Sequence, residues 1–287
     1  MTGFDLGSVL FGNTDWMVHV LDVGASDLAG EQAPYEKLVR AGRARVVGFE
    51  PDAAACERLN AKYGGVHRFL PYFVGDGNAA TFHETNWSLT GSLFRPNRPL
   101  LEKFQNLHEV VTLKAEHPVQ TMRLDDIPEV GDVDFVKIDV QGAELAVFQG
   151  GERVLRDALL VQTEVEFVEL YENQPLFGDV DRQLRACGYQ FHTFAGLAGR
   201  CFKPLVVNND MNLPMRQLLW PDAIYVRDWL KLDALSDEKL RKLAILLHEV
   251  VGSFDLCHLV LQALDARGSG AAAPRYMSAL MNQHGGR

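Results

Sequence analysis

Hydrophobic and polar positions follow two alternating rhythms along much of this chain. From Val18 to about Glu166, runs of apolar and β-branched residues of strand length are separated by segments with helical spacing. This alternation predicts strand–helix–strand crossover units, and therefore a mainly parallel β-sheet flanked by helices. The five predicted strands are residues 18–23, 44–50, 67–74, 133–140 and 159–167.

The segments between the first three strands carry helix signals. Residues 33–41 have helical spacing and stop at Gly42, a residue that suits the position just beyond a helix. Residues 52–65 begin after Pro51 and end in a pair of glycines. Both segments are predicted to be helices.

Between residues 79 and 127 the rhythm breaks. Residues 81–84 and 108–127 resemble strands, and they flank a polar, turn-rich loop at residues 86–99. We expect a β-rich insertion over one edge of the sheet. Beyond the fifth strand, the pattern predicts a helix at 180–188 and two closing strands at 189–195 and 222–228.

The C-terminal region changes to helical spacing alone. Residues 236–251 place leucines, alanine and valines on one face behind a serine N-cap, and residues 253–266 repeat the pattern after Gly252. The expected organisation is an N-terminal segment (1–17), a sheet domain (18–232), a helical hairpin (233–266) and a linker-like, flexible tail (267–287).

Composition narrows the function. The chain has 287 residues, 47% of them hydrophobic, and a formal net charge of −10 with no run of basic residues. We therefore expect a soluble globular protein without a nucleic-acid-binding or anionic-membrane surface. No apolar stretch is long enough to cross a bilayer and no basic leader precedes one, so cytoplasmic residence is the expectation.

Cysteine and histidine spacing gives no metal signature. The four cysteines lie far apart, which predicts buried, reduced thiols, and no histidines have the i, i+4 spacing of a zinc site. His83 and His117 would line a site only if the insertion folds over it. Asp139 and Glu164 would suit a magnesium ion but lack a third ligand, so a divalent metal stays open.

Candidate chemistry gathers where the predicted strands end. Asp22, Val23 and Gly24 place a sharp turn at the carboxyl edge of the sheet, where open α/β sheets bind ligands. The alternative is a plain strand-to-helix turn. Glu50 ends the second strand, where an acid accepts hydrogen bonds from ribose hydroxyls. The loop lacks the G-x-G-x-x-G pattern of dinucleotide sites, and Asp27 would repel a phosphate.

The fourth predicted strand carries charges in an apolar setting. Lys137 and Asp139 share one face of this strand, where charged side chains are costly unless paired or functional. Asp139 is expected to meet Asp22 and Glu50 in one crevice, with Glu164 on the next strand. The structural alternative is an ion pair through Lys137 that merely fixes the sheet.

Two further acids have simple structural explanations beside functional ones. Glu144 suits the first turn of a helix, where the helix dipole favours an acid. Asp76 would accept a hydrogen bond from an adenine amine, although Asp76-Gly77-Asn78 is also typical of a hairpin turn.

Several of these segments, in the same order, resemble one enzyme family. The segments are LDVGAS, VVGFEPD, TMRLDDI, FVKIDVQGAELAVFQGG and VEFVELYENQPLFGDVDRQLRACGY. Together they are similar to the FkbM-type branch of class I S-adenosylmethionine-dependent methyltransferases, over about Val18 to Asp228. The resemblance implies a Rossmann-like seven-stranded sheet and methyl transfer to a hydroxyl of a sugar, glycan or secondary metabolite, with S-adenosylhomocysteine as product.

The resemblance also assigns residues. It implies that Asp22, Gly24 and Ala25 line the methionine moiety, that Glu50 holds the ribose, and that Asp139 and Glu144 lie beside the reacting methyl. The remaining cofactor-binding candidates are Ser26, Pro51, Asp52, Gly75 and Asp76, the last two near adenine. The chain departs from the family at residues 24–28, and at Gln141, where the family often has glutamate.

Methyl transfer to an alcohol needs a positioned base. The expectation is that Asp139 takes or orients the hydroxyl proton, tuned by Lys137 or Glu164, while residues 88–96 close over the site with Ser92 and Arg95 near the acceptor. Two alternatives stay open: a domain that binds cofactor or glycan without turnover, and an NAD-dependent oxidoreductase. The sequence is silent on the acceptor and on oligomeric state.

Overall fold

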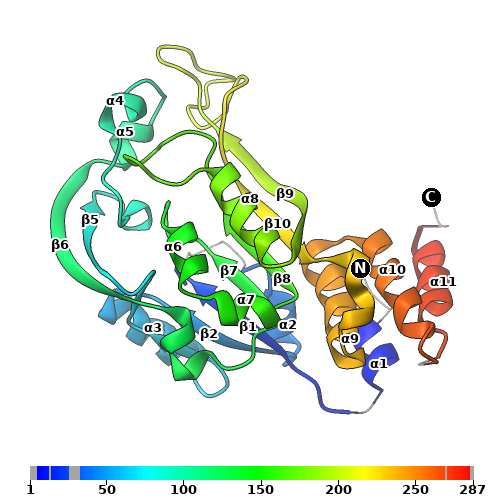
Figure 1. Cartoon of the computed structure of the whole chain (residues 1–287). Helices are drawn as coiled ribbons and strands as arrows, with labels where there is room; N and C mark the ends of the chain where they lie inside the picture. Colours follow the sequence, from blue (N-terminus) through cyan, green and yellow to red (C-terminus); the bar gives the residue numbers. More distant parts are fainter. Residues whose placement is uncertain (1–4, 13, 26–32, 269, 285–287) are drawn as a thin grey trace.

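A seven-stranded sheet forms the centre of the protein (Figure 1). The computed structural model describes residues 5–12, 14–25, 33–268 and 270–284. The sheet consists of β1 (Val18–Val23), β2 (Ala44–Phe49), β3 (Arg68–Leu70), β7 (Phe135–Ile138), β8 (Leu160–Glu164), β9 (Tyr189–Gly199) and β10 (Leu218–Arg227). Its order is β3–β2–β1–β7–β8–β10–β9, and only β10 runs against its neighbours, β8 and β9. The predicted mainly parallel α/β fold is confirmed.

The central strands are buried on both faces, which explains their continuous apolar runs. Val18 and Val20 of β1 belong to one hydrophobic cluster and Leu21 and Val23 to another. The second cluster includes residues of three helices, α6 (Glu144–Gln149), α7 (Glu152–Asp157) and α8 (Phe177–Ala186). The first includes Leu38 of α2 (Glu36–Arg40), while α3 (Ala53–Tyr63) packs beside β3. Each fully buried Val or Leu contributes roughly 1.5–3 kcal/mol.

The third predicted strand is two strands in different sheets. β3 ends at Leu70, and the chain continues as β4 (Phe73–Val74) in a separate three-stranded sheet. Pro71 lies between them and has no N–H to donate to a ladder, which explains the break. The prediction of one continuous strand at 67–74 was therefore wrong.

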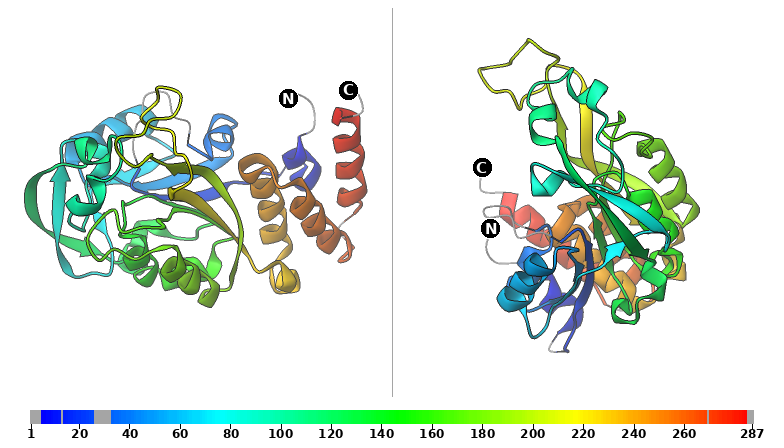
Figure 2. Two further views of the ribbon diagram at one scale, coloured as in Figure 1. Left: turned by 90° about the horizontal axis from the view of Figure 1, so that it is seen from above. Right: turned by 90° about the vertical axis from the view of Figure 1, so that its left-hand side faces the viewer.

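The insertion forms the small sheet, as expected, in the order β4–β6–β5. β5 (Ala79–Thr85) and β6 (Leu113–Met122) pair antiparallel, and β4 pairs with β6 in parallel. Between β5 and β6 lie η1 (Ser88–Thr90), α4 (Arg98–Leu101) and α5 (Leu107–Val110). The small sheet and the C-terminal helices lie at opposite ends of the molecule (Figure 2).

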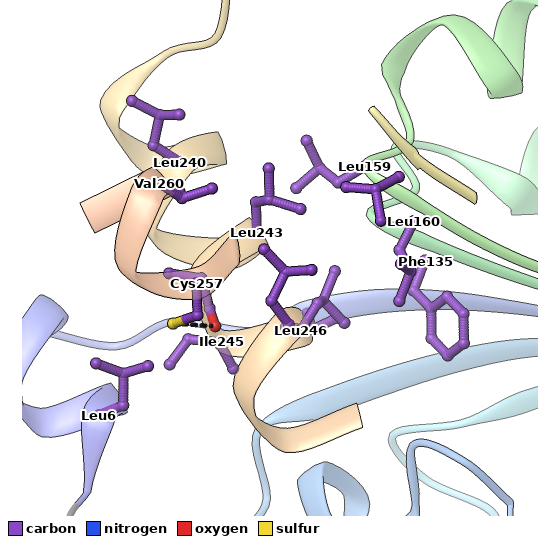
Figure 3. Close-up of a cluster of buried hydrophobic side chains, with 14 of the residues drawn as sticks. Leu6, Phe135, Leu159, Leu160, Leu240, Leu243, Ile245, Leu246, Cys257 and Val260 are labelled. Atoms are coloured by element: carbon purple, nitrogen blue, oxygen red, sulfur yellow. Dashed lines mark hydrogen bonds between the residues drawn. The ribbon is translucent and has the colours of Figure 1, made fainter. Parts of the chain in front are cut away.

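Three C-terminal helices pack together against the sheet domain. They are α9 (Asp237–Leu246), extended by the π-helical turn η5 (Leu247–Val251), α10 (Phe254–Asp265) and α11 (Ala272–His284). Figure 3 shows Leu243 and Leu246 of α9 facing Leu160 and Phe135 of the sheet. Helix α1 (Leu6–Phe11) completes this cluster through Leu6.

The expected linker-like tail contains helix α11. Ala272, Ala273 and Tyr276 are buried in the same cluster as α9 and α10. Spacings of three and four residues place these side chains on one helix face, so their burial stabilises α11. The sequence did not predict this helix at residues 272–284.

A buried ion cluster also joins α9 to the sheet domain. Asp134 is 1% exposed, and its carboxylate accepts bonds from Lys239 Nζ at 2.8 Å, Lys242 Nζ at 3.0 Å and the His19 N–H at 3.0 Å. Burial acts to raise the pKa of Asp134, but the two lysines and the His19 N–H outweigh it, and the pKa lies below its usual value. The charge of Asp134 therefore holds α9 in place.

Two further sequence predictions concern thiols and membranes. All four cysteines are free; Cys56, Cys201 and Cys257 are buried and Cys187 is half-buried. Throughout the described ranges, every helix is too short or too polar to cross a membrane.

Candidate active site

A cavity of about 1440 Å³ opens beside the carboxyl ends of the central parallel strands. Residues 23–25 after β1, 49–52 after β2 and 139–141 after β7 line one part of it. The insertion contributes residues 84–93, and β8 and β10 contribute Glu164, Trp220 and Asp222. The cavity thus lies where an open α/β sheet is expected to bind its ligand.

The turn after β1 requires glycine because two chain segments approach closely. Gly24 has φ +80°, and a Cβ added there would lie 1.9 Å from the Asp139 carbonyl oxygen. The N–H groups of Gly24 and Ala25 both donate to the Phe49 carbonyl, at 3.1 and 2.9 Å. The turn therefore joins the ends of β1, β2 and β7.

Ser26, which the sequence analysis gave as a cofactor-binding candidate after this turn, lies outside the described residues.

Glu50 lines the cavity directly after β2, as predicted. Its Oε1 accepts the N–H of Asp52 at 2.8 Å, and burial raises the pKa of Glu50 above its usual range. Pro51 and Asp52 also line the cavity, but the Asp52 carboxylate caps α3 by accepting the Ala55 N–H at 2.7 Å. Glu50 is therefore the carboxylate of this segment best placed to contact a ligand.

Asp22 and Lys137 lie beneath the cavity wall. Asp22 is 6% exposed, accepts the Tyr35 hydroxyl at 2.6 Å and lies 3.4 Å from Lys137 Nζ. Burial acts to lower the pKa of Lys137, but the carboxylates of Asp22 and Asp139 raise it above its usual value. Lys137 is thus a permanent cation. Of the three acids expected in one crevice, Glu50 and Asp139 reach the wall and Asp22 holds Lys137 behind it.

Asp139 is the accessible carboxylate of this group. It follows β7, its side chain is 39% exposed, and its Oδ2 lies 3.8 Å from Lys137 Nζ. Its other oxygen, Oδ1, accepts a 2.7 Å hydrogen bond from Gln141 Nε2, which also donates to Glu164 Oε2 at 2.7 Å. The predicted trio of Asp139, Lys137 and Glu164 is brought together, with Gln141 between the two acids.

Two buried glutamates, Glu144 and Glu166, lie near this trio and affect its electrostatics. Burial and the neighbouring charges of Asp139 and Glu166 raise the pKa of Glu164 well above its usual range. Burial also raises the pKa of Glu144, to about 7. Glu144, which is 2% exposed, accepts the N–H groups of Val140 and Gly142 at 2.9 and 3.2 Å, so it shapes the loop rather than facing the cavity.

Gly75 and Asp76 are not among the described residues that line the cavity. Asp76 accepts the backbone and side-chain N–H groups of Asn78 at 3.0 and 2.9 Å, which is the turn that the sequence also allowed. These bonds lower the pKa of Asp76. The cavity wall is formed instead by their neighbours, Tyr72, Phe73 and Val74.

The insertion contributes framework as well as wall. Ser92 is fully buried, and its hydroxyl donates to the Gln141 carbonyl at 2.6 Å, while Arg95 pairs with Glu116 at 2.9 Å. His117 lines the cavity, with Nε2 3.0 Å from a Glu84 oxygen. In the part of the chain that the structure describes, no three His, Cys, Asp or Glu side chains gather as a metal site.

Sequence reasoning missed the far end of the cavity. Trp220 and Asp222 of β10 and Arg200 after β9 line it, with the Arg200 guanidinium 5.1 Å from the Trp220 ring centre. Gln162 Nε2 donates to Asp222 Oδ2 at 2.9 Å. The alternation of Trp220 and Asp222 along a late strand was the available signal, but nothing in the sequence indicates which strand lies beside β8.

Residues 22–191 match the Methyltransferase FkbM domain, which is more than half of the chain. The protein belongs to the FkbM methyltransferase family. Its cofactor is S-adenosylmethionine, as the resemblance implied. The residues that line the cavity after β1, β2 and β7 all lie within this matched range.

The relatives of this FkbM methyltransferase are at moderate to low identity. The 2-O-methyltransferase NoeI of Sinorhizobium fredii (strain NBRC 101917 / NGR234) is 33% identical over 168 residues, which are 54% of this chain and 66% of NoeI, just under two thirds. Solved structures with distant similarity include magnesium protoporphyrin IX methyltransferase (ChlM) from Synechocystis PCC 6803 with bound SAM (12% identity, 77% of each chain, TM-score 0.37). A putative methyltransferase from Thermoplasma acidophilum has 10% identity over 79% of this chain and 76% of that chain, with a TM-score of 0.39.

The described residues of this FkbM methyltransferase fit S-adenosylmethionine. Glu50 presents a carboxylate to the cavity, apolar side chains of Phe49 and Val74 lie beside it, and the Gly24 turn leaves the adjoining wall without a side chain. Acid, apolar surface and bare backbone suit a ribose, an adenine and an amino-acid tail respectively.

Proposed function

We propose that this FkbM methyltransferase methylates a hydroxyl group of a sugar or glycan. The observation that carries the proposal is the Asp139 carboxylate, which is exposed to the cavity, adjoins the Gly24 turn and is backed by Lys137. NoeI, a relative at 33% identity, is named a 2-O-methyltransferase, and this supports oxygen as the acceptor atom. A hydroxyl on a secondary metabolite is the other acceptor class that the resemblance implies.

In this proposal the cavity divides into two parts. Glu50 binds the ribose hydroxyls, while Val23, Gly24 and Ala25 hold the methionine end of the cofactor. When bound, S-adenosylmethionine supplies a methyl group on a sulfonium, and it leaves as S-adenosylhomocysteine. Lys137 remains a cation, and its pairing with Asp22 limits its repulsion of a sulfonium nearby.

Asp139 handles the proton. An alcohol is far too weak an acid to ionise near neutral pH, so a carboxylate within hydrogen-bond reach must orient it and accept its proton as the new oxygen–carbon bond forms. Asp139 Oδ1 is occupied by Gln141, which assigns the proton to Oδ2. Lys137, 3.8 Å from Oδ2, places a positive charge beside the oxygen that receives the proton.

The far end of the cavity suits a carbohydrate. Glu164 and Asp222 offer hydrogen-bond acceptors, and Trp220 offers an aromatic surface beside them. Sugars present hydroxyl donors around an apolar ring face, so carboxylates beside a tryptophan match both kinds of surface.

Binding of the cofactor is tested by calorimetric titration with S-adenosylmethionine, S-adenosylhomocysteine and NAD. We expect both sulfur compounds to bind the wild type, NAD not to bind, and Glu50→Ala to lose the binding. NAD binding alone would contradict the proposal. Uptake of S-adenosylmethionine without S-adenosylhomocysteine formation across hydroxylated sugars would instead identify a binding domain without turnover.

The role of Asp139 is tested by Asp139→Asn, which keeps the shape of the side chain and removes its charge. General base catalysis contributes typically 10²- to 10⁴-fold, so we expect kcat to fall by about that factor while the affinity for S-adenosylmethionine is retained. Asp132→Asn, an exposed aspartate outside the cavity, serves as the control. Near wild-type turnover in Asp139→Asn would remove Asp139 from the mechanism.

A further inference from the structure

Gln141 is more extensively fixed than a cavity-lining side chain needs to be. Its two short bonds run to carboxylates after different strands, Asp139 after β7 and Glu164 at the end of β8. Because both amide hydrogens are used on these acids, the amide orientation is settled by its partners. The Tyr171 hydroxyl lies 3.2 Å from Gln141 Oε1 and 2.9 Å from the Thr90 carbonyl, so its one hydrogen is shared between these two acceptors.

The backbone of Gln141 is held as firmly. Its φ is +56°, a left-handed conformation that is rare for a residue with a side chain and costs on the order of 1 kcal/mol. The Ser92 hydroxyl donates to its carbonyl at 2.6 Å, and Glu144 takes the N–H groups on either side of it. Strained residues that are over-determined in this way gather at functional sites.

We propose that Gln141 is the positioning residue for proton transfer, because its amide holds Asp139 and Glu164 together and directs one Asp139 oxygen to the acceptor. This inference rests on the proposed function, in which Asp139 takes the hydroxyl proton. It deepens that function by giving a role to a residue that sequence reasoning treated only as a missing acid.

With Asp139 and Glu164 placed as they are in this chain, an amide suits position 141 better than a carboxylate. Two carboxylates are 2.7 Å from the Gln141 nitrogen, so a third would face them across hydrogen-bond distance and force a proton to be shared. Several charged and titratable groups surround Asp139 and Glu164. They are Lys137 from β7, Glu144 from α6, Glu166 and Tyr171 from the segment after β8, and Asp222 from β10. Lys137 is the single cation among them, so the two N–H donors of Gln141 carry much of the compensation.

The variants that test this are Gln141→Met, which removes the donors at similar volume, and Gln141→Glu, which adds an acid. Displacement of a catalytic group by about 1 Å costs up to 10²-fold, so we expect kcat in Gln141→Met to fall roughly 10- to 100-fold without loss of cofactor affinity. In both variants the acid limb of the kcat profile should move to higher pH, because the ionised acids lose donors or gain a like charge.

The matched control is Gln190→Met. Gln190 also donates to a carboxylate, that of Asp228 at 3.3 Å, but neither residue lines the cavity within the described ranges. We expect its pH profile to match that of the wild type. A purely structural role for Gln141 would lower stability and leave the acid limb where it is, and that result would overturn the proposal.

A second readout does not depend on turnover. Carbon-13 NMR of labelled carboxyl groups should show the titration midpoint of Glu164 at higher pH in Gln141→Met than in the wild type. An unchanged midpoint would overturn the proposal. If the wild type methylates no hydroxylated acceptor, the proposed function fails, while the NMR midpoint still decides whether Gln141 controls these carboxylates.

Discussion

Replacement of Gly24 by alanine should slow methyl transfer by moving the ends of two strands apart. The added Cβ would lie 1.9 Å from the Asp139 carbonyl oxygen, whereas Cβ atoms in proteins essentially never come within 3.0 Å of a heavy atom outside their own residue and its chain neighbours. The obstacle is backbone and does not swing aside, so the ends of β1 and β7 must move apart. The displacement is about 1 Å, and misplacing a catalytic group by this amount can cost on the order of 10²-fold in rate.

The control for this variant is Gly42→Ala. Gly42 has φ +66°, close to the +80° of Gly24, but a Cβ there meets nothing within 4 Å. Both substitutions therefore pay the same left-handed conformational penalty of about 1–2 kcal/mol, which lowers the free energy of unfolding in each variant. Only Gly24→Ala moves Asp139.

Chemical denaturation, cofactor titration and single-turnover methyl transfer on the three proteins would measure these effects. We expect Gly24→Ala to lose more stability than Gly42→Ala, because its strand ends must also separate, and we expect the methyl-transfer rate to fall about 100-fold for Gly24→Ala alone. Equal rates in Gly24→Ala and Gly42→Ala would refute the argument that the strand ends are packed too closely for a side chain.

Three further results are expected. Asp134→Asn should lose about 3 kcal/mol of stability, measured by urea unfolding, since it removes the buried counter-charge of Lys242 and leaves it with the exposed Glu238, 3.2 Å away. Folding lowers the pKa of Asp134, so the stabilisation by this carboxylate is present above its unfolded pKa, near 4, and is lost as the pH falls through the folded value. The difference in stability between Asp134→Asn and the wild type should therefore disappear in acid, and a difference that stays constant with pH would contradict this. Trp220→Ala should raise KM for a sugar acceptor roughly tenfold with unchanged cofactor affinity, unlike Trp229→Ala outside the cavity, and equal KM values would remove Trp220 from acceptor binding. Hydrogen exchange at residues 88–96 should slow when cofactor and acceptor are both bound, and unchanged exchange would exclude closure of this segment.

The sequence predicted those parts of the fold that depend on local periodicity. Strand length, helical spacing and the order of elements are encoded within windows of about ten residues, and β1, β2, β7 and β8 lie where these patterns place them. The break at Pro71 was visible in the sequence but was outweighed by the apolar residues around it. Helix α11 was missed because the Gly- and Ser-containing residues before it indicate a linker. The few apolar side chains that fix the helix, such as Tyr276, are buried by contacts with other helices that the local sequence does not show.

The site was predictable to the extent that it lies at strand ends. Glu50, Asp139 and Glu164 reach the cavity because the carboxyl ends of parallel strands share one edge of a sheet. Asp22 occupies the same level, yet its bonds to Tyr35 and Lys137 hold it beneath the wall. That outcome depends on side-chain pairing, which spacing along the chain does not encode.

Gln141, Arg200 and Trp220 escaped prediction for a related reason. Each owes its importance to contacts between segments far apart in sequence, such as the 2.6 Å bond from Ser92 to the Gln141 carbonyl. Gln141 was noted in the sequence only as a departure from the pattern of the family that the chain resembles. In the structure its amide donates to two acids at once, a pairing that the sequence does not indicate.

The hydrophobic cluster shared by the C-terminal helices and the sheet has a consequence for engineering. Leu243 and Leu246 pack in the same cluster as Leu160 and Phe135, so residue 232 is not a place where the chain can be cut without exposing apolar surface on both sides (Figure 3). A chimera built from this sheet domain must therefore keep its own helices α9 to α11, because another protein's C-terminal region would not match the packing of this cluster. The sheet domain and the C-terminal helices would have to be transferred together. Acceptor specificity would be altered by substitutions at the rim of the cavity rather than by exchanging the C-terminal region.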